Sequence, residues 1–146
     1  MKRKSQRGST LLEFALGFSL LVPLFAGLFQ FGYTFWVYNQ LQGAVHAGSR
    51  YAANLAYDSP DATPSAAYAN AVRNIVVYGS PQGGTTPVVP GLTPAHVRVE
   101  MVFLRNAPAT VVVDIDGLTI SSIFRSYSMA GKPRAAFPYL GRWAPV

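Results

Sequence analysis

The chain has 146 residues, half of them hydrophobic, and a formal net charge of +6. Four of its twelve basic residues lie within the first seven positions, so the rest is nearly neutral and lacks the basic and aromatic clusters that bind nucleic acid. The absence of cysteine excludes disulfides, thiolate metal sites and a cysteine nucleophile. The length allows one membrane element and one small domain of about 90–100 residues.

The first predicted element is a membrane-spanning helix that follows a basic leader. Residues 14–37 contain no charged side chain, and as a helix these 24 residues extend about 36 Å, enough to cross a hydrocarbon core of about 30 Å. The positive-inside rule places the leader in the cytoplasm and everything after Tyr38 outside it. The leader cations are Lys2, Arg3, Lys4 and Arg7.

Aromatic, proline and glycine residues mark special points along this helix. The aromatic side chains cluster at its far end, as expected for rings in the headgroup layer. Pro23 predicts a kink or local unwinding. The glycines are either ordinary for a membrane helix or allow close packing against other copies, and the sequence leaves both readings open. The interface residues are Tyr33, Phe35, Trp36 and Tyr38, and the glycines are Gly17, Gly27 and Gly32.

A cleaved secretory signal peptide is the alternative to a retained membrane helix. The basic leader fits this alternative, and residues 45–47, Val-His-Ala, resemble a small-residue cleavage site. A signal peptide has an apolar region of about 7–15 residues. The run in this chain is longer and ends well before Ala47, so we favour the membrane helix.

One carboxylate, Glu13, lies at the edge of the apolar run. Thr10-x-x-Glu13 matches a capping box, worth about 1 kcal/mol, and a carboxylate also suits the first turn of a helix. An ionisable group at the edge of a membrane segment is otherwise a candidate functional residue. If the basic leader were removed by cleavage after Gly8, Glu13 would become the fifth residue of the shortened chain.

The helix is predicted to continue to Tyr57 with a stripe suited to close packing. His46 is not expected to bind a metal, because no other ligand lies at a suitable spacing. Arg50 is either a functional residue or an arginine that faces solvent or forms a salt bridge. Residues 58–64 break the helix, Ser65 caps a second helix from Ala66 to about Val77, and residues 79–94 form a long loop. The stripe comprises Leu41, Ala44, Gly48, Ala52 and Leu55.

Alternating apolar residues then predict a small antiparallel sheet. The strands are residues 97–103 and 110–116, joined by a turn at 106–109, with a third strand at 124–129. The fold class is therefore α+β: a long N-terminal helix continuing into an extracytoplasmic domain with a second helix and a small sheet. The domain is expected to span residues 58–130, followed by a tail, residues 131–146, that is either a docking arm or a poorly ordered terminus.

No catalytic or cofactor-binding pattern is present, so we expect neither an enzyme nor a bound cofactor or metal. Asp114 and Asp116 are predicted to share one face of their strand, which is compatible with two interpretations. The pair could form a cation or acid-pair site, or it could belong to a solvated face of the sheet with Arg98 nearby. We favour the second reading.

The first third of the chain also resembles a known family. Gly8, four further residues and Glu13-Phe14 resemble the type IV prepilin signature in its Flp/Tad (tight adherence) form. The later segments 21–24, 31–32, 41–44 and 47–53 resemble a TadE-like pilin, so the resemblance covers about residues 7–53.

This resemblance implies cleavage by a membrane-embedded prepilin peptidase between Gly8 and Ser9, at a site recognised through Glu13 and Phe14. It also implies that Glu13 pairs with the N-terminal amine of a neighbouring subunit, and that other pilin subunits and Tad inner-membrane assembly proteins are partners. Ser9 departs from the phenylalanine of type IVa pilins, so N-methylation is not carried over.

The implied protein is a minor pilin or pseudopilin involved in pilus assembly, adhesion and biofilm formation. It would lie in the bacterial inner membrane with its domain in the periplasm, or be incorporated into the extracellular pilus. The main alternative is an uncleaved, single-pass extracytoplasmic binding protein. A type II secretion pseudopilin ranks third.

Overall fold

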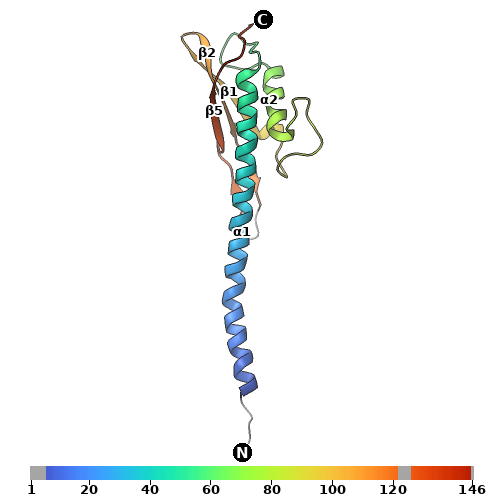
Figure 1. Ribbon diagram of the computed structural model, residues 1–146, viewed down its shortest axis with the longest axis vertical. Helices are drawn as coiled ribbons and strands as arrows, with labels where there is room; N and C mark the ends of the chain where they lie inside the picture. The colour runs from blue at the N-terminus through green and yellow to red at the C-terminus, as the bar shows by residue number, and fades with distance from the viewer. Residues whose placement is uncertain (1–5, 122–125, 146) are drawn as a thin grey trace, which may run out of the picture.

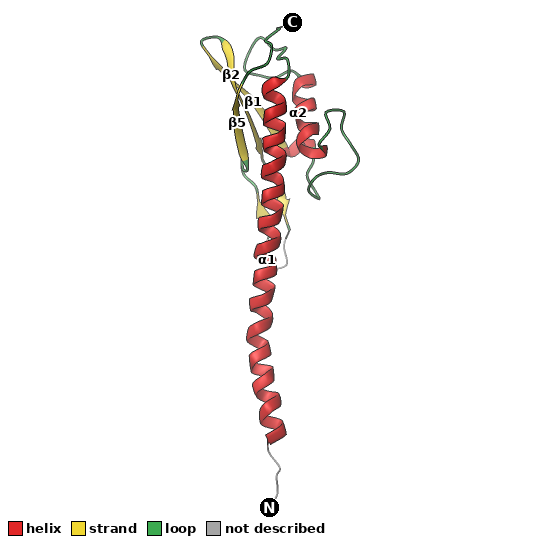
Figure 2. Cartoon of the chain, in the orientation of Figure 1, coloured by secondary structure: helices red, strands yellow, loops and turns green. Residues whose placement is uncertain are grey.

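The computed structural model describes residues 6–121 and 126–145. Helix α1 (Gln6–Asn54) carries a small domain on its C-terminal part, and its N-terminal part projects alone (Figure 1). The domain contains α2 (Ala66–Tyr78) and a three-stranded antiparallel sheet, so the predicted α+β class is confirmed (Figure 2).

Helix α1 runs without interruption through Pro23, so the predicted local unwinding is absent. Proline removes only one backbone hydrogen bond, and the turns on either side keep theirs. The helix ends at Asn54 and not at Tyr57, because the Tyr57 N–H donates to the Arg142 carbonyl at 2.9 Å instead of continuing the helix.

The boundaries of α2 follow the predicted local signals. The Ser65 hydroxyl accepts a hydrogen bond from the Tyr68 N–H at 3.1 Å, which satisfies one free donor of the first turn. Gly79 ends the helix at φ 73°, and its N–H donates to the Ile75 carbonyl. The predicted second helix is therefore confirmed.

The main sheet has the order β1-β2-β5, with all pairs antiparallel. A short 3-10 turn, η1 (Pro94–His96), leads into β1 (Val97–Leu104), which pairs with β2 (Ala107–Ile115). Val113 of β2 lies opposite Val99 of β1 and Ala135 of β5 (Arg134–Pro138), and all three are buried. The face that they share packs against the helices.

The hairpin turn between β1 and β2 differs from the prediction. Arg105 and Asn106 form the turn, both with left-handed φ values of 52° and 62°. Two residues of positive φ suit the right-handed twist of a tight hairpin, and asparagine tolerates that conformation. Pro108, predicted in the turn, lies in β2 opposite Phe103, where the register shifts.

The predicted third strand is also wrong. Its described part forms β4 (Tyr127–Ser128), which pairs with β3 (Thr119–Ile120) in a separate two-stranded sheet; residues 124–125 lie outside the described residues. The third strand of the main sheet is β5, from the predicted tail. Its short run, Arg-Ala-Ala-Phe-Pro, contains two alanines, so its alternation is weak.

The C-terminal segment completes the domain, so the boundary predicted at residue 130 separates β5 from its own sheet. After β5 the chain passes the end of α1, where the Leu140 N–H donates to the Ala53 carbonyl at 2.8 Å. Trp143 forms an isolated parallel β-bridge with Tyr57, and its indole N–H donates a hydrogen bond to the Ser59 carbonyl at 3.0 Å. These bonds satisfy backbone groups that a helix end leaves free.

Candidate membrane and assembly segment

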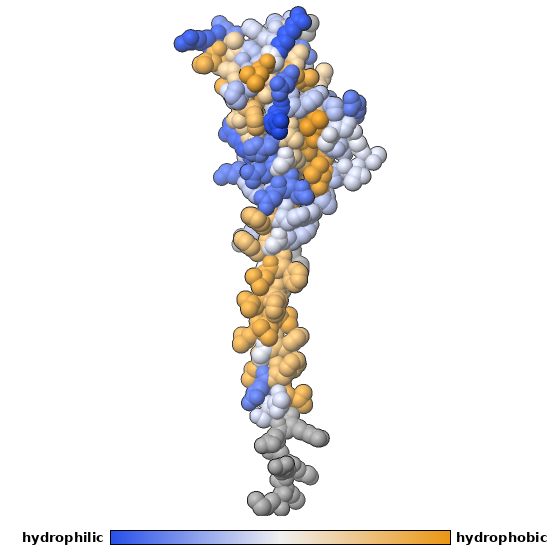
Figure 3. Space-filling view, viewed as in Figure 1, coloured by the Kyte–Doolittle hydropathy of each residue, from blue (hydrophilic) through white to orange (hydrophobic). Residues whose placement is uncertain are grey.

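The N-terminal half of α1 contributes no residue to the core of the domain. Its large apolar side chains are exposed from Leu11 to Trp36, whereas Val37 is only 1% exposed. Figure 3 shows this half as a column of hydrophobic side chains below a more polar domain. Exposure of such a surface to water costs free energy, so large exposed apolar surfaces usually mark contacts with a membrane or another protein.

Among the described residues, one helix is long and apolar enough to cross a membrane. Its best 18-residue window has a mean hydropathy of 2.0, and none of that window is buried. A core helix of a soluble domain has similar composition but is mostly buried, which distinguishes the two cases here. The length, composition and exposure of α1 therefore fit anchoring in a membrane.

The aromatic residues predicted at the interface lie immediately before the domain begins. Tyr33, Phe35 and Trp36 are exposed and Tyr38 is half-buried. The Tyr33 and Trp36 rings lie 6.1 Å apart, on the same side of the helix. Rings with polar edges favour the headgroup layer, so their position fits the outer edge of a membrane span.

The packing of α1 argues against the signal-peptide alternative. A cut after Ala47 would remove the segment of α1 that contains Val37, Leu41 and Val45. All three are at most 1% exposed and belong to the core of the domain. The mature domain would lose one wall of its own core.

The predicted cleavage and assembly residues all lie on the exposed part of α1. Gly8, Ser9, Glu13 and Phe14 are exposed, and the Phe14 ring stacks on Phe18 at 5.8 Å. A Cβ atom added to Gly8 would meet no described atom within 4 Å, so packing against the described residues does not require glycine there.

The capping-box reading of Glu13 is wrong in this structure. Helix α1 begins at Gln6, so Thr10 lies inside the helix and cannot be its N-cap. Glu13 is correspondingly beyond the first turn, where the helix dipole has little effect. In the uncleaved chain, a helix cap therefore does not account for a carboxylate at this position.

Residues 8–50 match the family model of TadE-like proteins. The resemblance seen in the sequence is confirmed for this segment, which contains the exposed half of α1 and most of its buried half. No curated protein and no solved structure matches the chain. We call residues 8–50 the TadE-like segment.

The C-terminal part of the TadE-like segment packs against the domain as its stripe of small residues predicts. A Cβ added to Gly48 would overlap the Val76 side chain of α2, so glycine allows the two helices to approach closely. The His46 ring lies edge-on to Phe137 at 5.9 Å. Arg50 is exposed and lines a shallow depression with Ala47, Tyr51, Asn54 and Leu55.

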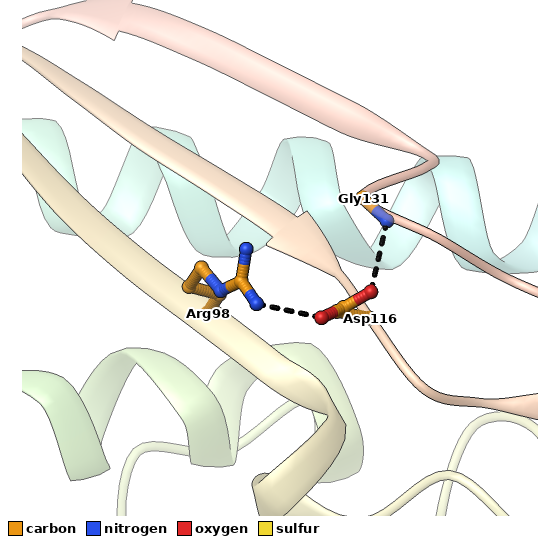
Figure 4. A network of polar contacts seen from close by, with 3 residues as sticks. All are labelled: Arg98, Asp116 and Gly131. Atoms are coloured by element: carbon orange, nitrogen blue, oxygen red, sulfur yellow. Dashed lines mark hydrogen bonds and ion pairs between the residues drawn. The ribbon is translucent and has the colours of Figure 1, made fainter.

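Beyond the TadE-like segment, the two strand aspartates have different surroundings. Asp116 pairs with Arg98 at 2.6 Å and accepts a hydrogen bond from the Gly131 N–H at 3.2 Å (Figure 4). Asp114 is only 7% exposed, and burial raises the pKa of its carboxyl, an effect that Arg98 and Arg134 oppose. The predicted neighbour Arg98 is confirmed, but Asp114 is not solvated.

These acids do not gather into a metal site in the described part of the chain. Residues 6–121 and 126–145 contain no group of three or more metal-ligating His, Asp or Glu side chains. Arg98 lies opposite Asp114 in the strand register and pairs with Asp116, so the acids are balanced by arginines from neighbouring strands.

The aromatic cluster that packs at the C-terminal end of α1 was not predicted from the sequence. The Tyr139 hydroxyl accepts a hydrogen bond from the Tyr57 N–H and lies within 2.9 Å of the Leu55 carbonyl. The Tyr57 ring also packs against Tyr68 and Phe103. The density of aromatic residues in the C-terminal segment was the available signal, because such rings rarely remain solvated together.

Proposed function

We propose that the chain is a minor pilin or pseudopilin of a Flp/Tad-type pilus. The observation that carries this proposal is one continuous helix with two different halves. Its bare, membrane-length half bears Gly8 and Glu13-Phe14, and its other half forms a wall of the domain core. The match of residues 8–50 to TadE-like proteins supports the same reading.

Leader removal after Gly8 is the first step of the proposed role. Glycine in a helix costs about 1 kcal/mol relative to alanine, and no contact among the described residues explains its presence at position 8. A requirement from outside the chain, such as a peptidase subsite that accepts only a small residue, explains it. Glycine also lowers the cost of unwinding the helix around the scissile bond.

Intact mass spectrometry of the membrane-extracted protein tests this step. Coexpression with a prepilin peptidase should yield a chain that begins at Ser9, and Gly8→Leu should keep residues 1–8. Gly17→Leu is the matched control, because Gly17 is equally open on the same helix and should leave cleavage unchanged. A wild-type chain that retains its leader would instead support an uncleaved, anchored extracytoplasmic binding protein.

Assembly through Glu13 is the second step. In a bundle of helices with little water, a carboxylate paired with the Ser9 amine of a neighbouring subunit costs far less than either charge alone. That pair would fix the axial register between subunits. Glu13 is exposed and so is available for an intermolecular contact.

Recovery in sheared pilus fractions tests the role of Glu13. Glu13→Ala should insert and be cleaved but should be lost from the pili, because the neighbouring amine then has no partner. Glu100→Ala is the control, since Glu100 is an exposed glutamate on β1. Equal recovery of Glu13→Ala and wild type would refute the assembly contact.

In this proposed role the chain is a structural subunit and not an enzyme. The leader lies in the cytoplasm, the domain in the periplasm, and partners are the prepilin peptidase, other pilin subunits and Tad inner-membrane assembly proteins. The assembled protein would contribute to adhesion and biofilm formation. Deletion of its coding sequence should therefore lower surface attachment without abolishing growth.

A further inference from the structure

The domain begins at the level where a membrane would end. If Phe14 lies at one edge of the hydrocarbon core, about 20 helical residues cross it and reach the vicinity of residue 34. The headgroup layer then extends over about three to five more residues. Val37, the first buried side chain of α1, falls inside that layer. Some part of the domain must therefore lie among the headgroups.

The part of the domain at this level is the pair of short strands β3 and β4. In Figures 1 and 2 they are the two short arrows beside α1, on the N-terminal side of the main sheet, where the bare helix begins. Ile120 of β3 is 6% exposed and belongs to the same core cluster as Val37 and Leu41. The pair is thus fixed to α1 through the core.

The side chains that β3 and β4 expose have the character of a lipid interface. Tyr127 lies opposite Ile120 and is 45% exposed, and its neighbours Thr119 and Ser128 are exposed hydroxyl residues. An apolar ring with a polar edge favours the headgroup layer. Two exposed cations, Lys132 and Arg134, lie at or beside the start of β5, and Arg134 pairs with the end of β2 that leads into β3.

We propose that β3 and β4 form a second contact with the lipid headgroup layer, beside the aromatic residues of α1. The first contact is the helix itself and the second is Tyr127 with its hydroxyl neighbours. Two contacts at separate points would hold the domain at a set angle to the membrane before assembly. The inference rests on the membrane anchoring of α1 in the proposed function.

Site-directed spin labelling of the full chain in phosphatidylcholine–phosphatidylglycerol vesicles tests this inference. Because the chain has no cysteine, each single-cysteine variant carries one label without further substitutions. Three positions have nearly equal exposure in the structure: Tyr127 at 45%, Trp36 at 50% and Val102 at 48%. Collision of each label with oxygen and with a water-soluble nickel chelate reports its depth.

We expect Tyr127→Cys to resemble Trp36→Cys, with a loss of nickel collisions and a gain of oxygen collisions relative to Val102→Cys. Val102 lies near the hairpin turn of the sheet, at the end opposite to Ile115, from which the chain leads into β3, and should report bulk water. A Tyr127 label as accessible to nickel as the Val102 label, with Trp36 protected, would overturn the inference and leave the anchoring intact. An accessible Trp36 label would overturn the anchoring itself.

All three side chains are about half exposed and none belongs to the core of the domain, so each substitution leaves that core intact. The circular dichroism of each labelled variant should match wild type. If Tyr127→Cys fails this check, Ser128→Cys takes its place, because Ser128 is its exposed neighbour in β4 and the same two outcomes apply.

Discussion

Gly48 shows how one residue can set the distance between two helices. It lies on the buried face of α1, and the position of a Cβ atom there is already occupied by the Val76 side chain. Val76 is fully buried and β-branched, so it has few alternative rotamers. The close contact between α1 and α2 requires glycine at this point in spite of its cost to the helix.

Gly48→Ala should therefore destabilise the domain although alanine favours helix. The helix gains up to about 1 kcal/mol, whereas overpacking a core costs about 1–3 kcal/mol. Gly43→Ala is the control, because Gly43 is exposed on the same helix with nothing within 4 Å, and it should be neutral or stabilising. Thermal unfolding of the detergent-solubilised chain measures both, and equal midpoints for the two variants would contradict the packing account.

At the scale of elements, β5 and the residues after it join the sheet to the end of α1. β5 pairs with β2, which makes β2 the central strand, buried along its second half. Tyr139 and Leu140 then bond to the carbonyls of Leu55 and Ala53. The C-terminal segment thus links elements that are more than 80 residues apart in sequence.

Deletion of residues 131–146 should abolish cooperative unfolding of the domain. Without β5, the backbone groups of β2 from Thr110 to Asp114 lose their hydrogen-bond partners on one side, and each lost hydrogen bond costs about 0.5–1.5 kcal/mol. Deletion of Pro145 and Val146 alone should have little effect. Limited proteolysis in detergent distinguishes the outcomes, and equal resistance of the two truncations would show that the segment is dispensable.

At the scale of the whole molecule, the two halves of α1 have different surroundings and separable roles. The half before Val37 contributes no residue to the core of the domain, while the half that begins at Val37 contributes Val37, Leu41, Ala44 and Val45. Anchoring depends on the first half and folding of the domain on the second. A continuous helix transmits any orientation fixed in the membrane directly to the domain.

A chain that starts at Thr34 should fold as a soluble domain, whereas one that starts at Gly48 should not. The second truncation removes four buried apolar side chains, a loss on the order of 5 kcal/mol or more against a typical total stability of 5–15 kcal/mol. Circular dichroism and size-exclusion chromatography of the two fragments check this. A folded fragment 48–146 would revive the signal-peptide reading.

Local patterns predicted much of this structure. The 24-residue apolar run, the Ser65 cap and the alternation in β1 are each set by residues close in sequence, and each is confirmed. β2 is confirmed as a strand, but its predicted alternation is not, because all residues from Val111 to Ile115 are buried. The failures share a different property. The hairpin turn depends on strand register, and the assignment of β5 depends on pairing with a strand about 25 residues away. Neither has a strong local signal.

The sequence by itself determined that the chain has a membrane-length helix, a TadE-like N-terminal pattern and an α+β domain, because apolar length, spacing and periodicity are properties of neighbouring residues. Only the tertiary structure decided which half of α1 is exposed and that the C-terminal segment supplies a strand of the sheet. It also showed that Thr10 lies inside α1 and is not its N-cap. These features depend on which distant segments cover one another. Burial is a property of the folded chain, and a sequence pattern reports it only where the covering partner is predictable.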